Sequence, residues 1–333
     1  MSSAASGNAS RRGRRMFNDS YAPAEWSFST YARPFKSVID ASTGWDGTSV
    51  QGHAVEEILW AALVGNGVFS AGSENANSSW AAGQGMANTS TTMTADFSAS
   101  NVASLKELNI YFIMGQGTYA SGTHTVYKLD GAVVNSAGLD FDLDGITTIN
   151  WSGFAKLITE EANIPTVTIS EGASDTGNFI RNRLTTLGVT NGDGGNFAAT
   201  YNLTLTGGSI NFENNITFIT PETLGVVNQP FAAVTGTRNI GGSFTCYLGN
   251  HSAGSADLFE DLIESTTSIT NDFNLVFTVG GATAPKIAIT LPTCHLEVPT
   301  HSIEDVISLE TTFHALPSTI DGADEASIVY TGA

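Results

Sequence analysis

The sequence is poor in positive charge, and its few bases are unevenly placed. Of 333 residues, 13 are Lys or Arg and 32 are Asp or Glu, which gives a formal net charge of −19. Residues 1–15 contain no acid but hold four of the bases, Arg11, Arg12, Arg14 and Arg15. The rest of the chain therefore carries 9 bases against 32 acids. Because Lys and Arg supply the affinity for phosphate, we expect this body to repel DNA rather than bind it.

Cysteines and long apolar runs are also scarce. Cys246 and Cys294 are too few for a disulfide framework in a chain of this length, so we expect buried, reduced thiols. The longest apolar run, from Ile58 to Val64, is far shorter than the roughly 20 residues of a membrane-spanning helix. No apolar core region of a signal peptide precedes Met16. These absences predict a soluble, cytoplasmic protein with no membrane partner.

Motifs of catalysis and cofactor binding are missing from the sequence. It contains no G-x-S-x-G, no G-x-x-x-x-G-K-[ST] and no complete G-x-G-x-x-G. The six histidines are dispersed, and the spacing of Cys294, His295 and His301 fits no usual zinc site. We therefore predict a protein that is not an enzyme, with no catalytic, cofactor-binding or metal-binding residues.

One segment does resemble the opening of a calcium-binding loop. Residues 140–145 read DFDLDG, but the twelfth position of such a loop is Trp151, where a bidentate Glu is required. The alternation of Leu139, Phe141 and Leu143 instead favours a strand with its aspartates towards solvent and Gly145 in a turn. We favour the strand and leave calcium binding by Asp140–Asp144 open.

The remaining composition favours strands, and four elements recur in the same order along the chain. Charged residues make up only 14%, and Gly, Ser, Thr and Asn are abundant, which suits short strands joined by turns. The repeated strands are 27–31 with 243–247, 108–112 with 273–277, 125–134 with 287–296, and 146–155 with 306–315. Each copy also has a short amphipathic helix, with apolar stripes Val55, Ile58, Leu59, Ala62 and Leu258, Phe259, Leu262, Ile263. Acidic residues flank both stripes, among them Glu56 and Glu57.

This order predicts a duplicated, mainly β protein with two tandem β-sandwich or barrel domains, each flanked by a short α-helix. Copy 1 spans 21–162 and contains a long loop, 65–107, while copy 2 spans 163–317. Strands within 163–242 are candidates to complete the sheet of copy 1 as well as that of copy 2. Residues 1–20 are expected to be a flexible basic arm, and 318–333 a loosely held acidic tail.

The second half of the chain resembles phage tail tube proteins. The resemblance covers about residues 180–317. It rests on the runs 203–208 (LTLTGG), 214–217 (NNIT), 220–225 (TPETLG), 228–230 (NQP), 235–238 (TGTR), 242–248 (GSFTCYL) and 303–310 (IEDVISLE), ending at Phe313 and Leu316. Copy 1 resembles the family only through its similarity to copy 2.

The resemblance implies a structural role in the virion tail, in a protein assembled in the host cytoplasm. Single-domain members of the family form hexameric rings that stack into a hollow tube. In duplicated members three chains make a pseudo-hexameric ring. The tube encloses a tape-measure protein and then conducts DNA without binding it specifically, and a sheath protein is a further possible partner. An acidic wall fits such a channel, because each phosphate contact would slow the passage of DNA.

The basic arm has a hypothetical partner in this assembly. Arg11, Arg12, Arg14 and Arg15 are candidates to contact the acidic surface of an adjacent ring. The alternative is an arm without a role. Two other functions also stay open: another tail component of the same fold, such as a distal tail, terminator or fibre protein, and a carbohydrate-binding β-sandwich.

Overall fold

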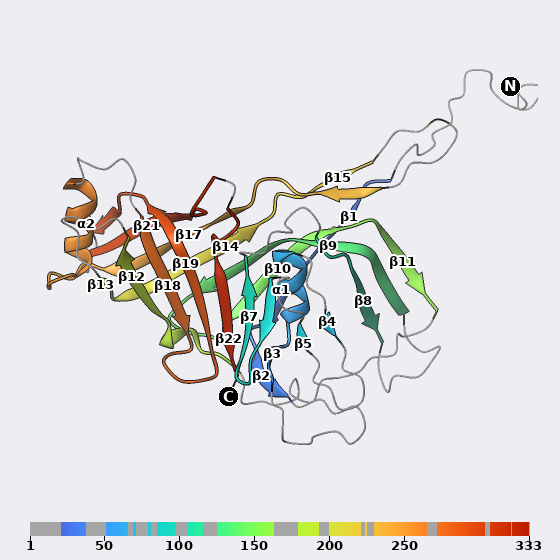
Figure 1. Cartoon of the computed structure of the whole chain (residues 1–333), viewed down its shortest axis with the longest axis horizontal. Coiled ribbons are helices and arrows are strands. Elements are labelled where there is room, and N and C mark those ends of the chain that lie inside the picture. Colours follow the sequence, from blue (N-terminus) through green and yellow to red (C-terminus); the bar gives the residue numbers. More distant parts are fainter. Residues whose placement is uncertain are drawn as a thin grey trace, which may run out of the picture.

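A computed structural model confirms that the protein is mainly β (Figure 1). It describes residues 21–37, 51–65, 69–70, 79–80, 85–97, 105–115, 125–162, 179–192, 200–220, 224, 230–264, 272–303, 307–320 and 322–332. The strands are β1 (Ala24–Tyr31), β2 (Pro34–Ser37), β3 (Gln51–Ala54), β4 (Phe69–Ser70), β5 (Ser79–Trp80), β6 (Met86–Asn88), β7 (Thr92–Asp96), β8 (Leu108–Met114), β9 (Thr125–Phe141), β10 (Thr148–Ala155), β11 (Leu157–Glu161), β12 (Thr186–Asn191), β13 (Thr200–Asn202), β14 (Leu205–Glu213), β15 (Thr217–Ile219), β16 (Ala232–Val234), β17 (Asn239–Tyr247), β18 (Phe273–Val279), β19 (Lys286–Leu296), β20 (Thr300–Ile303), β21 (Ile307–Ala315) and β22 (Ser327–Thr331). The two helices of the described part are α1 (Glu57–Val64) and α2 (Ser255–Glu264).

One antiparallel sheet runs through both halves of the chain. Its order is β1-β10-β9-β14-β17-β21-β19-β18-β12-β13. β14 pairs with β9 on one edge and with β17 on the other, so a strand of the middle segment completes the sheets of both copies, as predicted. In Figure 1, α2 lies at one end of the long axis, and β8 and β11 lie at the other.

The two halves repeat the same strand order and the same register. β1-β10-β9-β8 in the first half corresponds to β17-β21-β19-β18 in the second. Residues matched by the sequence repeat occupy matching positions in the ladders. Phe28 lies opposite Trp151, as Phe244 lies opposite Thr311. Ile149 lies opposite Leu139, as Leu309 lies opposite His301. Phe112 lies opposite Tyr127, as Phe277 lies opposite Ile289. The irregularity between Leu108 and Ile110 on β8 also recurs between Phe273 and Leu275 on β18.

A further strand extends this correspondence to the end of the chain. β11 lies along β9 with Glu160 opposite Tyr127, and β22 lies along β19 with Ile328 opposite Ile289. The expectation of a loosely held tail at 318–333 is therefore wrong for β22, where Ile328 and Tyr330 are fully buried. Its period-two alternation is short and follows an acidic stretch, which hides it in the sequence.

The segment 65–107 is also more than a loop. It contains β6 and β7, and β7 pairs with β22 so that Thr94 lies opposite Val329. Met93 and Ala95 of β7 are fully buried. The abundance of Ser, Thr and Asn around this strand conceals an alternation of only five residues, which is why the sequence predicted a loop.

The helices match their predicted positions but not all of their predicted faces. In α2, Leu258 and Leu262 are buried as expected, whereas Ile263 is exposed. In α1, Ile58 is exposed, while every residue from Leu59 to Val64 is buried. α1 packs between β7 and β9, so the core surrounds it and a one-sided stripe does not describe its burial.

Two expectations from the scarce residue types can be compared directly with the structure. Cys246 and Cys294 are free and buried, as predicted. Burial raises the pKa of the Cys246 thiol to about 11 and that of Cys294 well above its usual range. In the part of the chain that the structure describes, neither helix is long and apolar enough to cross a membrane.

Candidate functional site

The most distinctive surface of the protein is a polar face on the long sheet, formed by β1, β10, the second half of β9, β14, β17, β21 and β20. Side chains alternate along these strands, and one side of the sheet forms the core with residues such as Trp151, Phe212 and Phe244. The other side carries mainly hydroxyl, amide and carboxylate groups, together with the imidazole of His314 and the ring of Phe154. Its polar members are Glu25, Ser27, Ser29, Ser136, Asp140, Asn150, Ser152, Ser209, Asn211, Glu213, Ser243, Thr245, Thr300, Ser302, Glu310, Thr312 and His314.

Hydrogen bonds join these side chains across neighbouring strands. The Ser29 hydroxyl donates to Oδ1 of Asn150 at 2.6 Å, and the hydroxyls of Ser136 and Ser152 are 2.7 Å apart. On β14, Nδ2 of Asn211 donates to Oε1 of Glu213 at 2.8 Å. Hydrogen bonds thus hold part of the face, and the serines among the bonded residues are short side chains that lose little conformational freedom when they are fixed.

No Lys or Arg belongs to the strand segments that form the polar face. The nine bases of the described part lie on other elements, and several are neutralised there. Nζ of Lys128, on the first half of β9, is 2.8 Å from Asp130. Arg238 is buried, with its guanidinium 4.8 Å from the ring centre of Phe97 and 2.9 Å from a carboxylate oxygen of Glu325. The polar face thus presents carboxylates, hydroxyls and amides without a fixed cation.

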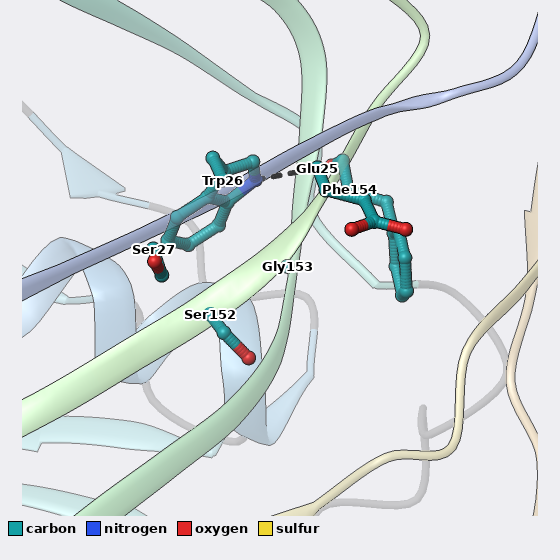
Figure 2. Close-up of a pocket in the computed structure, with 6 residues that line it drawn as sticks. All are labelled: Glu25, Trp26, Ser27, Ser152, Gly153 and Phe154. Atoms are coloured by element: carbon teal, nitrogen blue, oxygen red, sulfur yellow. Dashed lines mark hydrogen bonds between the residues drawn. The ribbon is translucent and has the colours of Figure 1, made fainter.

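A groove of about 340 Å³ opens at the end of this face, where β1 forms the edge of the sheet (Figure 2). Glu25, Trp26 and Ser27 line it from β1, and residues 152–154 line it from β10. The indole of Trp26 lies over Gly153, and its Nε1 donates to the Phe154 carbonyl at 3.2 Å. Among the described residues, β1 pairs only with β10, so the groove adjoins an open strand edge.

The calcium-like segment is divided between a strand and a turn. Asp140 belongs to β9 and faces solvent, and Gly145 has a φ of 134°, a conformation that favours glycine. Leu143, however, is 54% exposed, so the predicted alternation ends at Phe141. The Asp142 carboxylate accepts a hydrogen bond of 2.8 Å from Asn182. Within the described ranges, no group of three or more His, Cys, Asp or Glu is arranged to hold a metal ion.

The other sequence candidates are scattered. Arg11, Arg12, Arg14 and Arg15 lie outside the described residues. Cys294 is buried and bonds weakly to the carbonyl of Leu291, whereas His301 packs edge-on against Phe259 of α2 at 4.4 Å.

Sequence reasoning missed a buried carboxyl group at the start of α1. Glu56 was expected to flank the apolar stripe, but it is only 2% exposed. Its Oε1 accepts from the backbone N–H of Arg33 at 3.3 Å, and its Oε2 is buried without a hydrogen-bond partner among the described residues, close to the hydroxyl of Tyr330. That hydroxyl accepts from Nε1 of Trp60 at 2.7 Å. Burial raises the pKa of Glu56 to about 7. Only the fold reveals this cluster, because Tyr330 is 270 residues from Trp60 in sequence.

The long antiparallel sheet, its internal repeat and its cation-free polar face define a structural assembly protein. The chain belongs to the family of phage tail tube proteins, because the model of the family "Phage tail tube protein" matches residues 49–315. This match extends the resemblance seen at 180–317 through most of the first half. The chain is thus a structural component of the virion tail and not an enzyme.

One curated relative agrees with this assignment. The chain is 29% identical over 324 residues to the tail tube protein pb6 of Escherichia phage T5. The alignment covers 94% of this chain and 63% of that protein, so the chain spans less than two thirds of the relative's length.

Proposed function

We propose that three copies of this chain close into a pseudo-sixfold ring and that the rings stack into the hollow tail tube. The observation that carries the proposal is the repeated register of the two halves, because a chain with two equivalent units presents six units in a trimer. The proposed units are 21–162 and 163–317, and β22 extends the second unit to Thr331. A head-to-tail contact that closes makes a ring rather than an open fibre.

In this ring the polar face lines the channel. DNA that passes through meets hydroxyls, amides and the carboxylates of Glu25, Asp140, Glu213 and Glu310, with no cation to hold a phosphate. A tape-measure protein occupies the channel before ejection, and a sheath is a possible outer partner; both follow from the family alone.

The basic arm contacts the acidic surface of the next ring in this arrangement. Such a contact between exposed charges is screened by salt. Deleting residues 1–15 is therefore expected to lower the yield of tubes most strongly at low ionic strength. If the deletion variant and the intact chain give the same yield of tubes at every salt concentration, the four arginines have no part in stacking.

The ring is tested by measuring the mass of the purified assembly and by negative-stain microscopy. Analytical ultracentrifugation or native mass spectrometry is expected to give a species of three chains, and microscopy to show rings that stack. A monomer at high concentration, or a ring of six chains, would overturn the proposal.

A further inference from the structure

The junction between the two halves of the chain is made by a single strand. β14 lies between β9 and β17, and the row across this junction is Gly138, Asn211 and Gly241. The three residues lie on the polar face. β9 and β17 are therefore two strand spacings apart, about 10 Å.

The register repeat assigns an equivalent to each side of this junction. Thr300 on β20 lies opposite Glu310, as Gly138 on β9 lies opposite Asn150, so Thr300 is the equivalent of Gly138. By the same comparison, Glu25 on β1 lies opposite Phe154, as Gly241 on β17 lies opposite His314, so Glu25 is the equivalent of Gly241.

Both equivalent strands have an open edge in the described part of the chain. β20 pairs only with β21, and β1 pairs only with β10. The groove beside Glu25 and Trp26 adjoins the β1 edge (Figure 2). In the other half, β14 covers β17 at the equivalent position. Unpaired strand edges of this kind are templates for pairing with another chain.

We propose that β20 of one chain and β1 of the next chain are joined through one intervening strand, in the register of the β9-β14-β17 junction. The partner is a second copy of this chain, and one of the two copies supplies the intervening strand. This inference rests on the proposed ring and adds its register. Glu25 of one chain then faces Thr300 of its neighbour, two strand spacings away on the polar face.

Within one chain, Glu25 and Thr300 are too far apart for a short linker to join them. Six strand steps separate β1 from β20, which corresponds to about 29 Å at the usual spacing. A short chemical link between residues 25 and 300 therefore reports a junction between chains.

The test is the double variant Glu25→Cys and Thr300→Cys, assembled and then treated with a bismaleimide about 10 Å long, matching twice the strand spacing. We expect denaturing gels to show linked dimers and trimers, with no species beyond three chains. Oxidation without a linker is expected to give no disulfide, because a disulfide needs Cβ atoms about 4 Å apart. The wild-type protein is the background control, since Cys246 and Cys294 are buried thiols with raised pKa values.

A matched control fixes the register. Ser29 is on the same face of β1, four residues from Glu25, and the pair Ser29→Cys and Thr300→Cys is therefore displaced by roughly 14 Å along the strand. We expect little linkage from this pair. Equal linkage of both pairs, or none in rings that form normally, overturns the proposed junction while leaving the ring intact.

Two other results also decide the question. Direct disulfide formation in the first pair would show that β1 and β20 are neighbours with no strand between them, which contradicts the inference. If single Glu25→Cys and Thr300→Cys variants and the wild-type protein all fail to form three-chain rings, the proposed ring is wrong and the junction is wrong with it.

Discussion

Trp26 of β1 lies directly over Gly153 of β10, whereas in the equivalent pair of the second half the glycine is on the first strand and the aromatic residue is on the second. The two residues face each other between β1 and β10, and a Cβ on Gly153 would lie 2.6 Å from Cζ2 of the indole. The equivalent residues in the second half are Gly242 and Phe313, which also face each other. There a Cβ on Gly242 would lie 2.9 Å from Cζ of the phenyl ring. One large ring fills the site in each copy, but it comes from opposite strands.

The first prediction follows from this packing. Gly153→Ala places a Cβ against both the indole of Trp26 and the carbonyl oxygen of Val133. Because this overpacks a buried site, we expect a loss of roughly 1–3 kcal/mol in the free energy of unfolding. The control is Gly138→Ala, where the nearest atom to a new Cβ is Oδ1 of Asn211 at 3.5 Å, an ordinary contact. Urea unfolding of both variants measures the difference. Equal stability of the two would contradict the close approach of Trp26.

The second prediction concerns Glu56. Its folded-state pKa is about 7 against an ordinary 4.5, so the folded protein retains a proton that the unfolded chain releases. Stability is therefore expected to fall as pH rises from about 4.5 to about 7, by about 3 kcal/mol for this group. The facing groups are the hydroxyl of Tyr330, the N–H of Arg33 and the neighbouring carboxylate of Glu57.

Glu56→Gln tests this dependence, since Gln keeps the size and removes the titration. Near pH 4 we expect the variant and the wild-type protein to melt together. At pH 8 we expect the variant to be more stable, by up to about 3 kcal/mol. Glu310→Gln, on the exposed face of β21, is the control, and its stability is not expected to diverge from that of the wild-type protein between about pH 4 and pH 8. Parallel pH profiles of the Glu56 variant and the wild-type protein would rule out a proton on Glu56.

The third prediction concerns the ion pair of Arg238 and Glu325, whose side chains are only 4% and 12% exposed. Glu325→Gln leaves a buried guanidinium without its counter-charge, and Nε and Nη2 of Arg238 have no hydrogen-bond partner among the described residues. We expect a loss of about 3 kcal/mol in the free energy of unfolding. Asp130→Asn breaks the more exposed pair with Lys128 and is expected to cost less than about 1 kcal/mol. Thermal melts that rank these two variants in the opposite order would contradict the buried pair.

The sequence revealed the repeated strands because their order and spacing survive even where the residues differ. The match of Ser27 to Ser243, and of Ser152 to Thr312, predicts the equivalent ladder pairs that the structure contains. Helix α2 was equally accessible, since it lies at the end of the sheet and only one side of it is covered.

Other features could not be predicted because they depend on contacts between distant segments. Helix α1 is enclosed by the core, so its burial is not periodic, and Glu56 is buried by a tyrosine from β22. The polar face is a further example. Each strand alone shows alternation, but which residues share a face depends on the register of seven strands.

The fourth prediction tests the channel face through its lack of cations. Ser29 and Asn211 are exposed on this face, and replacing both by Lys would add six cations to a ring of three chains. Each new cation can hold a phosphate, so we expect virions assembled with the double variant to release DNA more slowly at low salt. Raising the ionic strength is expected to restore the rate, because salt weakens contacts between Lys and phosphate. The release rate is measured by the fluorescence of a DNA-binding dye.

The control for this prediction is the pair Ser29→Gln and Asn211→Gln, which adds side chains of similar reach without charge. It separates a steric effect from an electrostatic one, since a narrower channel would slow release equally at every salt concentration. Thr283→Lys, in the exposed turn between β18 and β19, adds three cations away from the face and is expected to leave release unchanged. If the Lys and Gln variants release DNA at the same rate in low salt, the polar face does not meet DNA, and the channel has to be lined by another surface of the chain.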